Sequence, residues 1–328
     1  PMLRTESSFA RAFAVFAIVG VIAAPVHAHR IVATIPVAGL PVGLALSGDQ
    51  SFLYVCNLGT DLVQVIDISK RQVVDAIRTG DGPIWIALRP TSAEAYVANF
   101  DADTVAVIDT ATRAVLKQIH VEHGPHNVVF SPDGSLAYVA IFGDKDDYGT
   151  TVDVVDADSR TVVASIQAGL GPHQVIVSDD GTTAYVANFG SSSVSVIDTA
   201  SRIVIGEIPT DDYPTGLAFA SGGAELYVSH YFDLGVASVI DLALSKVVAL
   251  IPVGPGGHVL TLSPDGSQVH VANGFSSDVT IIDVVTRQAV QTYGVGEGPH
   301  GILFYPDGSE IYTANLFDDS VTVVSFIP

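Results

Sequence analysis

The stretch that decides the fold is Tyr96-Val97-Ala98-Asn99, because close variants of it return along the whole chain. Successive copies begin 42, 42, 47, 42, 43 and 42 residues apart. A fixed period of this length indicates a repeat architecture in which each repeat is one structural unit. The seven copies are Tyr54-Val55-Cys56-Asn57, Tyr96-Val97-Ala98-Asn99, Tyr138-Val139-Ala140-Ile141, Tyr185-Val186-Ala187-Asn188, Tyr227-Val228-Ser229-His230, His270-Val271-Ala272-Asn273 and Tyr312-Thr313-Ala314-Asn315.

Each repeat holds four segments with the pattern of β-strands. In the second repeat, residues 96–99 are followed by alternating stretches at 105–109 and 114–119, then by a Gly-Pro turn and a fourth stretch at 127–130. The alternation, the β-branched content and the Gly, Pro and Asp punctuation are typical of strands, and no stretch after residue 28 has a helical pattern. Four strands in each of seven repeats predict an all-β fold, a seven-bladed β-propeller with four-stranded antiparallel blades.

The two ends of the chain complete each other. Residues 312–328 supply the first part of the last repeat, and residues 29–53 supply the length that is missing. We therefore predict that residues 30–37 form the outer strand of the last blade. This closes the ring and makes residues 29–328 one domain.

Residues 1–28 have the layout of a secretory signal peptide. Arg4 and Arg11 precede an apolar run at 12–24, and Val26-His27-Ala28 offers a cleavage site between small residues. The apolar run is too short to span a bilayer, which needs about 20 residues. The sequence thus predicts a periplasmic or secreted protein with no membrane insertion after signal removal.

The composition narrows the range of partners. A net charge of −21 excludes nucleic acid and anionic membranes, because both need a basic face. Cys56 is the single cysteine, so no internal disulfide can form, and its place in the repeat indicates a small buried strand residue. We expect a monomer.

The repeat resembles that of the YVTN (Tyr-Val-Thr-Asn) family of β-propellers, with Ala commonly in place of Thr, over residues 29–328. The resemblance implies the propeller fold but little chemistry. Proteins with similar repeats include surface-layer and binding propellers, a streptogramin lyase and relatives of the propeller domains of bacterial redox enzymes. Function must therefore be argued from the site.

Four histidines occupy one equivalent position of the repeat. The residue after each Gly-Pro turn recurs with the repeat spacing, and we expect the seven to meet in a ring around the central channel: Val42, Ile84, His126, His173, Thr215, His258 and His300. Neutral imidazole is a common metal ligand, which favours Cu, Zn or Fe over Ca or Mg. We predict a metal centre of His126, His173, His258 and His300 at the channel mouth. The alternative is that each imidazole only bonds the backbone of a neighbouring blade.

Further residues gather near the same turns. Glu122 and Glu297 are candidate catalytic residues that orient ligands or move protons. His123, Thr215 and His230 are candidate accessory residues, His230 because it replaces the usual Asn at a strand end. Trp85, which follows a ring position, is predicted to pack between blades.

A second set of positions, after the Tyr-Val-Ala-Asn strand, is aromatic and acidic. It includes an insertion at 144–149, and its aromatic residues are Phe100, Phe142, Phe189, Tyr231, Phe232, Phe275 and Phe317. This rim suits a small-molecule or cationic ligand, although aromatic caps on each blade and solvated loop acids would give the same pattern. The sequence favours a metal-dependent enzyme, an oxidoreductase or a lyase or hydrolase. The alternative is a non-catalytic propeller that binds a protein, glycan or metal ligand at the cell envelope.

Overall fold

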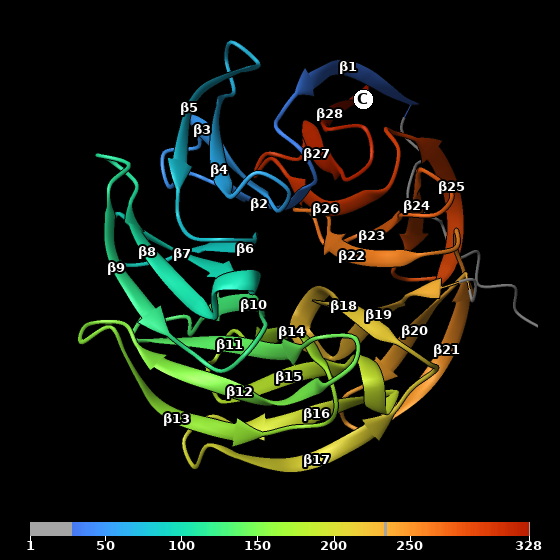
Figure 1. The fold of residues 1–328 in the computed structure, drawn as a ribbon. Helices are drawn as coiled ribbons and strands as arrows, with labels where there is room; N and C mark the ends of the chain where they lie inside the picture. The colour runs from blue at the N-terminus through green and yellow to red at the C-terminus, as the bar shows by residue number, and fades with distance from the viewer. Residues whose placement is uncertain (1–27, 233–234, 328) are drawn as a thin grey trace, which may run out of the picture.

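The computed structural model describes residues 28–232 and 235–327, and within them nearly all regular structure is β-strand. Seven antiparallel four-stranded sheets form seven blades in a ring around a central axis (Figure 1). The predicted seven-bladed propeller is confirmed. Three short 3₁₀ turns are the only helical elements in the described residues: η1 (Phe100–Ala102), η2 (Phe189–Ser191) and η3 (Ser221–Gly223).

The blades are numbered from the first complete sheet, each from its inner to its outer strand. Blade 1 contains β2 (Pro41–Leu46), β3 (Phe52–Asn57), β4 (Leu62–Asp67) and β5 (Gln72–Arg78). Blade 2 contains β6 (Pro83–Leu88), β7 (Glu94–Asn99), β8 (Thr104–Asp109) and β9 (Val115–His120). Blade 3 contains β10 (Pro125–Phe130), β11 (Leu136–Gly143), β12 (Tyr148–Asp156) and β13 (Thr161–Gln167).

The remaining blades follow the same plan. Blade 4 contains β14 (Pro172–Val177), β15 (Thr183–Asn188), β16 (Ser193–Asp198) and β17 (Ile203–Pro209). Blade 5 contains β18 (Pro214–Phe219), β19 (Glu225–His230), β20 (Val236–Asp241) and β21 (Lys246–Pro252). Blade 6 contains β22 (Gly257–Leu262), β23 (Gln268–Asn273), β24 (Asp278–Asp283) and β25 (Gln288–Gly294). Blade 7 contains β26 (Pro299–Phe304), β27 (Glu310–Asn315), β28 (Ser320–Ile327) and β1 (Ala28–Pro36).

Blade 7 joins the two ends of the chain, as the repeat arithmetic predicts. Strand β1 pairs antiparallel with β28, and Ile35 lies opposite Val321. In Figure 1 the dark blue β1 therefore lies beside the red β28. Blade 7 therefore has four strands like the other six blades, and the ring is closed by a strand from the other end of the sequence.

Inter-blade contacts hold the ring together. Each blade buries its apolar strand residues against its neighbours, and Cys56 is fully buried in the core shared by blades 1 and 2. Arginines in the left-handed conformation after the third strands add ion pairs to a glutamate of the preceding blade. These pairs are Arg71–Glu310, Arg160–Glu94 and Arg287–Glu225.

The inner strand of every blade carries a one-residue β-bulge just after its first residue. The register against the second strand shifts at this point in all seven blades, for example between Pro125 and Asn127 in β10. A bulge places two residues opposite one and re-aims the side chains there. The bulge falls on the ring positions predicted from the sequence, of which His126 is one.

The predicted signal peptide lies outside the described residues, apart from Ala28, the first residue of β1. In the part of the chain that the structure describes, no helix is long and apolar enough to cross a membrane.

Candidate metal centre

The propeller brings the four ring histidines together around its axis. Each is the second residue of an inner strand, in β10, β14, β22 and β26. The ring centroids of His126 and His173 are 3.9 Å apart, those of His173 and His258 are 5.5 Å apart, and those of His258 and His300 are 3.6 Å apart. Residues that are up to 174 positions apart in the sequence thus form one continuous imidazole cluster.

All four imidazoles are held in the neutral form. Three of them expose 6–7% of their surface, while His258 is partly exposed. Burial is the main cause that lowers the pKa of His126 to about 4, and burial also holds the pKa values of His173, His258 and His300 well below the usual range. Neighbouring imidazoles lower these last three pKa values further. Neutral imidazole is the form that binds metals.

Hydrogen bonding divides the cluster into two halves. His126 donates from Nδ1 to the backbone oxygen of His173 at 2.9 Å, which leaves its Nε2 with a free lone pair. A backbone hydrogen bond with Thr215 raises the pKa of His173 against the effect of burial. In contrast, the Nδ1 atoms of His258 and His300 are buried without a hydrogen-bond partner. A buried polar atom without a partner costs about 1–3 kcal/mol, so a ligand at these atoms would relieve a real cost.

A small cavity adjoins the first half of the cluster. Its volume is about 10 Å³, close to the minimum of about 10–15 Å³ that a single water needs. The cavity therefore has room for a water or an ion rather than for an organic molecule. Its lining residues are Trp85, His126, Asn127, His173, Gln174, Thr215 and Val259.

Trp85 lies across the channel rather than only between neighbouring blades. Its side chain packs against the core of blades 2 and 3 and also against that of blades 6 and 7, on the far side of the axis. The prediction of simple inter-blade packing is therefore incomplete. Gly43 lets the inner strands of blades 1 and 2 approach closely, because a Cβ at that position would lie 2.9 Å from the Trp85 Cα and 2.6 Å from the Ile84 oxygen.

The imidazoles pack as two tilted pairs and do not surround a point. The interplanar angle is 41° between His126 and His173 and 34° between His258 and His300. Within the described ranges, no group of three or more His, Cys, Asp or Glu side chains is arranged to hold a metal ion. Ligation of one ion at Zn–N or similar distances of about 2.0–2.1 Å would thus require the rings to rotate.

An aromatic layer covers the histidines, as predicted from the second set of positions. Phe142 packs against both His126 and His173, with centroid distances of 5.6 and 5.8 Å, and the ring centroid of Tyr231 lies 5.0 Å from that of His258. The inserted hairpin adds Tyr148, which contacts Phe142 at 5.4 Å. The cluster therefore sits beneath the rim and not at an open mouth.

The two candidate catalytic glutamates lie at the rim. Both are exposed, and Glu122 accepts a hydrogen bond from the Thr151 hydroxyl at 2.8 Å within blade 3. The backbone N–H of Glu297 donates a hydrogen bond to the Asp318 carboxylate. In the described part of the chain neither carboxylate bonds a ring histidine, so the structure does not bring them together with the cluster.

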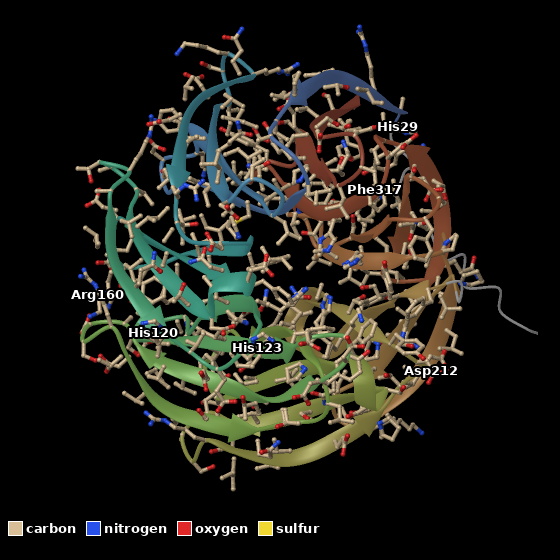
Figure 2. All side chains as sticks on the ribbon, in the orientation of Figure 1. His29, His120, His123, Arg160, Asp212 and Phe317 are labelled. Atoms are coloured by element: carbon tan, nitrogen blue, oxygen red, sulfur yellow. The ribbon has the colours of Figure 1, made fainter. Side chains whose placement is uncertain are left out.

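The accessory candidates have three different placements. Thr215 is fully buried in the ring and donates to the Gly257 carbonyl at 2.9 Å. His123 is exposed and pairs with Asp103 at 2.9 Å and Asp144 at 3.4 Å, and these hydrogen bonds raise its pKa. Figure 2 shows His123 on the inner part of the ring, whereas Arg160 lies at its outer margin.

His230 does not turn toward the mouth. Its Nδ1 donates to the Asp212 carbonyl at 3.0 Å, and its Nε2 accepts from the Ser238 hydroxyl at 2.7 Å. The side chain thus makes hydrogen bonds within its blade, as the Asn at the equivalent position of other blades does. Asn188, for example, donates to the Ser193 and Ser195 hydroxyls of its own blade. With both nitrogens engaged, His230 is a structural residue of blade 5, which corrects the expectation from sequence.

Two residues that sequence reasoning missed support the ring from the position after the histidines. The Asn127 side chain accepts from the Val175 N–H at 3.1 Å, and the Gln174 side chain accepts from the Leu217 N–H at 2.6 Å. Each links its inner strand to the next blade. The signal was their place directly after a ring histidine, where three of the other five repeats have Gly.

Comparison with known proteins places the chain among propellers. Residues 19–159 match the family model "Cytochrome D1 heme domain". The match covers less than half of the chain and includes only His126 of the four ring histidines. No curated protein sequence matches the chain. Among solved structures, a chain titled "Kuenenia stuttgartiensis Hydrazine Synthase" is similar, with 25% identity, a TM-score of 0.79 and coverage of 88% of this chain and 97% of that chain.

The channel residues do not fit the haem that the matched family name includes. The cavity beside the histidines is about 10 Å³, whereas pockets for organic ligands are roughly 300–1,000 Å³. Phe142 also packs directly on His126 and His173, so a macrocycle cannot lie against these two imidazoles from that side. A small ion is compatible with this channel, and a haem between the histidines is not.

Proposed function

We propose that this chain is a propeller of the YVTN type that holds one transition-metal ion, Cu, Zn or Fe, in its channel and acts as a metal-dependent oxidoreductase. The ligands are drawn from His126, His173, His258 and His300. The observation that carries the proposal is the pair of buried Nδ1 atoms, of His258 and His300, that have no partner inside a cluster of neutral imidazoles.

The energetic argument favours a ligand over a purely structural role. Histidines that only bond neighbouring blades would each have a backbone partner, as His126 has. His258 and His300 have none at Nδ1, yet their rings lie against each other. Buried polar groups in native proteins are nearly always satisfied, so a bound cation accounts for both nitrogens.

The residues around the cluster have defined roles in this proposal. The His126 Nδ1–H bond to the His173 carbonyl fixes the tautomer and presents Nε2 as a ligand atom. Thr215, held by Gly257, fills the ring position between the two histidine pairs. When bound, a copper or iron ion would supply one-electron chemistry, whereas zinc would act as a Lewis acid.

The comparisons support the redox class. The matched family and the similar structure both have names from redox biochemistry, and both are propellers in the region compared. A redox role therefore takes preference over a lyase or hydrolase. Export to the periplasm or to the medium belongs to the same proposal and rests on the sequence of residues 1–28.

Elemental analysis of the untagged protein tests the metal centre. We expect about one Cu, Zn or Fe per chain, or uptake of one equivalent of Cu²⁺ or Zn²⁺ by the metal-free protein in a calorimetric titration. The double variant His258→Ala/His300→Ala should lose affinity by on the order of 100-fold, because even supporting residues of metal sites act on that scale.

The matched control is His120→Ala, since His120 is an exposed histidine on the outer strand β9. This variant should bind metal as the wild type does. If the wild type takes up neither metal and the double variant is indistinguishable from it, there is no metal centre. Equal loss in His120→Ala would show that the bound metal is elsewhere.

A binding role without catalysis is the second candidate, and the rim favours it. Phe317, Phe275 and Phe232 expose 63%, 47% and 44% of their surface. Exposed aromatic groups of this size often mark interaction sites. Metal binding without redox turnover, together with capture of a ligand by the rim, would support this candidate over the oxidoreductase.

A further inference from the structure

One residue of each blade covers the histidine cluster from the rim side, and we call these seven residues the collar. They are equivalent by their backbone bonds: each N–H donates to the carbonyl of the residue two positions before a ring residue. For example, Phe189 donates to Gly171 and Leu58 donates to Leu40. The collar residues are Leu58, Phe100, Phe142, Phe189, Tyr231, Gly274 and Leu316.

Collar side chains lie over the ring residue of their own blade and over that of the next. Phe142 contacts both His126 and His173, and Tyr231 of blade 5 contacts His258 of blade 6. Leu58 and Leu316 pack on the core that includes the aliphatic ring residues Val42 and Ile84. Each ring residue is thus covered from two sides.

His300 breaks this rule, because the collar position of the preceding blade is Gly274. In the described residues, the only aromatic ring against His300 is that of His258. His258 itself has Tyr231 on one side and Gly274 on the other, and it is the one ring histidine that is partly exposed. The gap in the collar therefore exposes His258 and adjoins His300, which is buried; these are the two ring histidines whose Nδ1 atoms have no partner.

We propose that Gly274 is the specificity-determining position of the site: it is the opening through which a small ligand reaches the His258–His300 pair. The inference rests on the proposed function, since a metal or substrate must have a way into the cluster. An opening one side chain wide admits molecules of a few heavy atoms and excludes larger ones.

Charges near the opening narrow the ligand class. Glu297 and Asp318 are exposed in the loops of blade 7, and Asp278 is partly exposed just after Gly274. Three carboxylates disfavour anions, and the net charge of −21 acts in the same direction. The ligand class is thus a small neutral or cationic molecule. Glu297, a predicted catalytic residue, gains a role here in setting the charge at the opening.

A side chain at position 274 is compatible with the fold. A Cβ there would lie 3.4 Å from the Gly256 oxygen and 3.6 Å from the Pro299 oxygen, which is ordinary contact, and the residue is not in the left-handed region. Gly274→Phe restores the residue that blades 2, 3 and 4 have at this position. The variant should therefore close the opening without unfolding blade 6.

Chemical footprinting of the metal-free protein with diethylpyrocarbonate at pH 7 tests the opening. Neutral imidazole nitrogens react with this reagent, and mass spectrometry of peptides gives the rate at each histidine. In the wild type we expect the partly exposed His258 to react faster than the buried His126 and His173. Gly274→Phe should slow the reaction of His258 by about tenfold, a change of about 1.4 kcal/mol in the barrier.

Two further variants make the test directional. Phe189→Gly opens the collar over His173 and should raise the rate at that histidine, whereas Leu58→Phe lies over aliphatic ring residues and should change nothing. The rate at the exposed His120 is the internal reference. A rate at His258 that is the same in Gly274→Phe as in the wild type would overturn the proposal.

The outcome is separate from that of the metal experiment, because footprinting uses no metal. If no metal binds but the modification rates change with the collar residues as expected, the opening is supported and the metal centre is contradicted. If metal binds while Gly274→Phe leaves the modification rates unchanged, the metal centre is supported and the opening is contradicted.

Discussion

Between pH 7 and pH 4.5 the free energy of unfolding is expected to fall steeply. Five buried histidines and the partly exposed His258 cause this: burial lowers the pKa of His126 to about 4 and that of His270 to about 3. Burial also lowers the pKa values of the other four, and the six are His126, His173, His230, His258, His270 and His300.

The sign follows from proton binding. Above pH 6.5 these imidazoles are neutral in both states and have no effect on the pH dependence. As the pH falls through 6.5, these imidazoles bind protons in the unfolded chain. In the folded chain they bind protons only at a lower pH, because their pKa values there are lower, so the free energy of unfolding falls across this window. A fall from 6.5 to about 4 corresponds to roughly 3 kcal/mol for His126 alone. The pKa values of the other five imidazoles are lowered in the same direction, so their effects add to that of His126.

Urea unfolding followed by circular dichroism at pH 7, 6 and 5 measures the effect. Each buried imidazole contributes up to about 1.4 kcal/mol per pH unit to the slope. His270→Tyr should reduce the slope by about that amount, because Tyr occupies the equivalent position in the other six blades. His120→Ala should leave the slope unchanged. A stability that is constant from pH 7 to pH 5 would contradict the neutral, buried state of the cluster.

Gly301→Ala is expected to destabilise the ring by about 2–3 kcal/mol and to lower the Tm by roughly 5–10 °C. Gly301 follows the ring residue His300 in β26, and a Cβ there would lie well inside contact distance of the Val42 carbonyl oxygen in blade 1. Neither atom can move easily, because one is backbone of blade 7 and the other is backbone of blade 1. The substitution therefore pushes apart the first and last blades.

Gly206→Ala is the matched control for thermal unfolding. It also adds one methyl group to a strand glycine, but in β17 the Cβ would meet only the Val196 side chain, at 3.8 Å. Its expected effect is neutral or a stabilisation of about 0.4–1 kcal/mol, since Ala restricts the unfolded chain. Similar Tm values for the two variants would show that the inner strands of blades 7 and 1 are not in close contact.

The fold was predictable from sequence because its repeat places equivalent residues at equivalent places. The spacing of Tyr54, Tyr96 and their counterparts fixes the number of blades, and the lengths of the two terminal fragments require that β1 pair with β28. The convergence of the ring histidines follows from the same symmetry. These conclusions need only the order of residues along each blade.

The details of the site were less predictable, because they depend on local bonding that the period does not encode. His230 occupies an Asn position, and only the neighbouring Ser238 and the Asp212 carbonyl show that its ring stays inside the blade. Trp85 reaches across the axis to the core of blades 6 and 7, which its place in the repeat does not indicate. The bulge in each inner strand adds a second inward residue, which alternation alone does not reveal.

Ring closure by β1 and β28 has a consequence for the order of events during synthesis. Strand β1 is synthesised before the other strands of the propeller and its partner β28 after them, so blade 7 cannot form until the whole propeller sequence has left the ribosome. Until then β1 is an unpaired edge strand next to blade 1, which is open to pairing with other chains. Nascent chains that are truncated before β28 therefore retain β1 as an unpaired strand that can aggregate. A chaperone that shields β1 would be most useful before β28 has been synthesised.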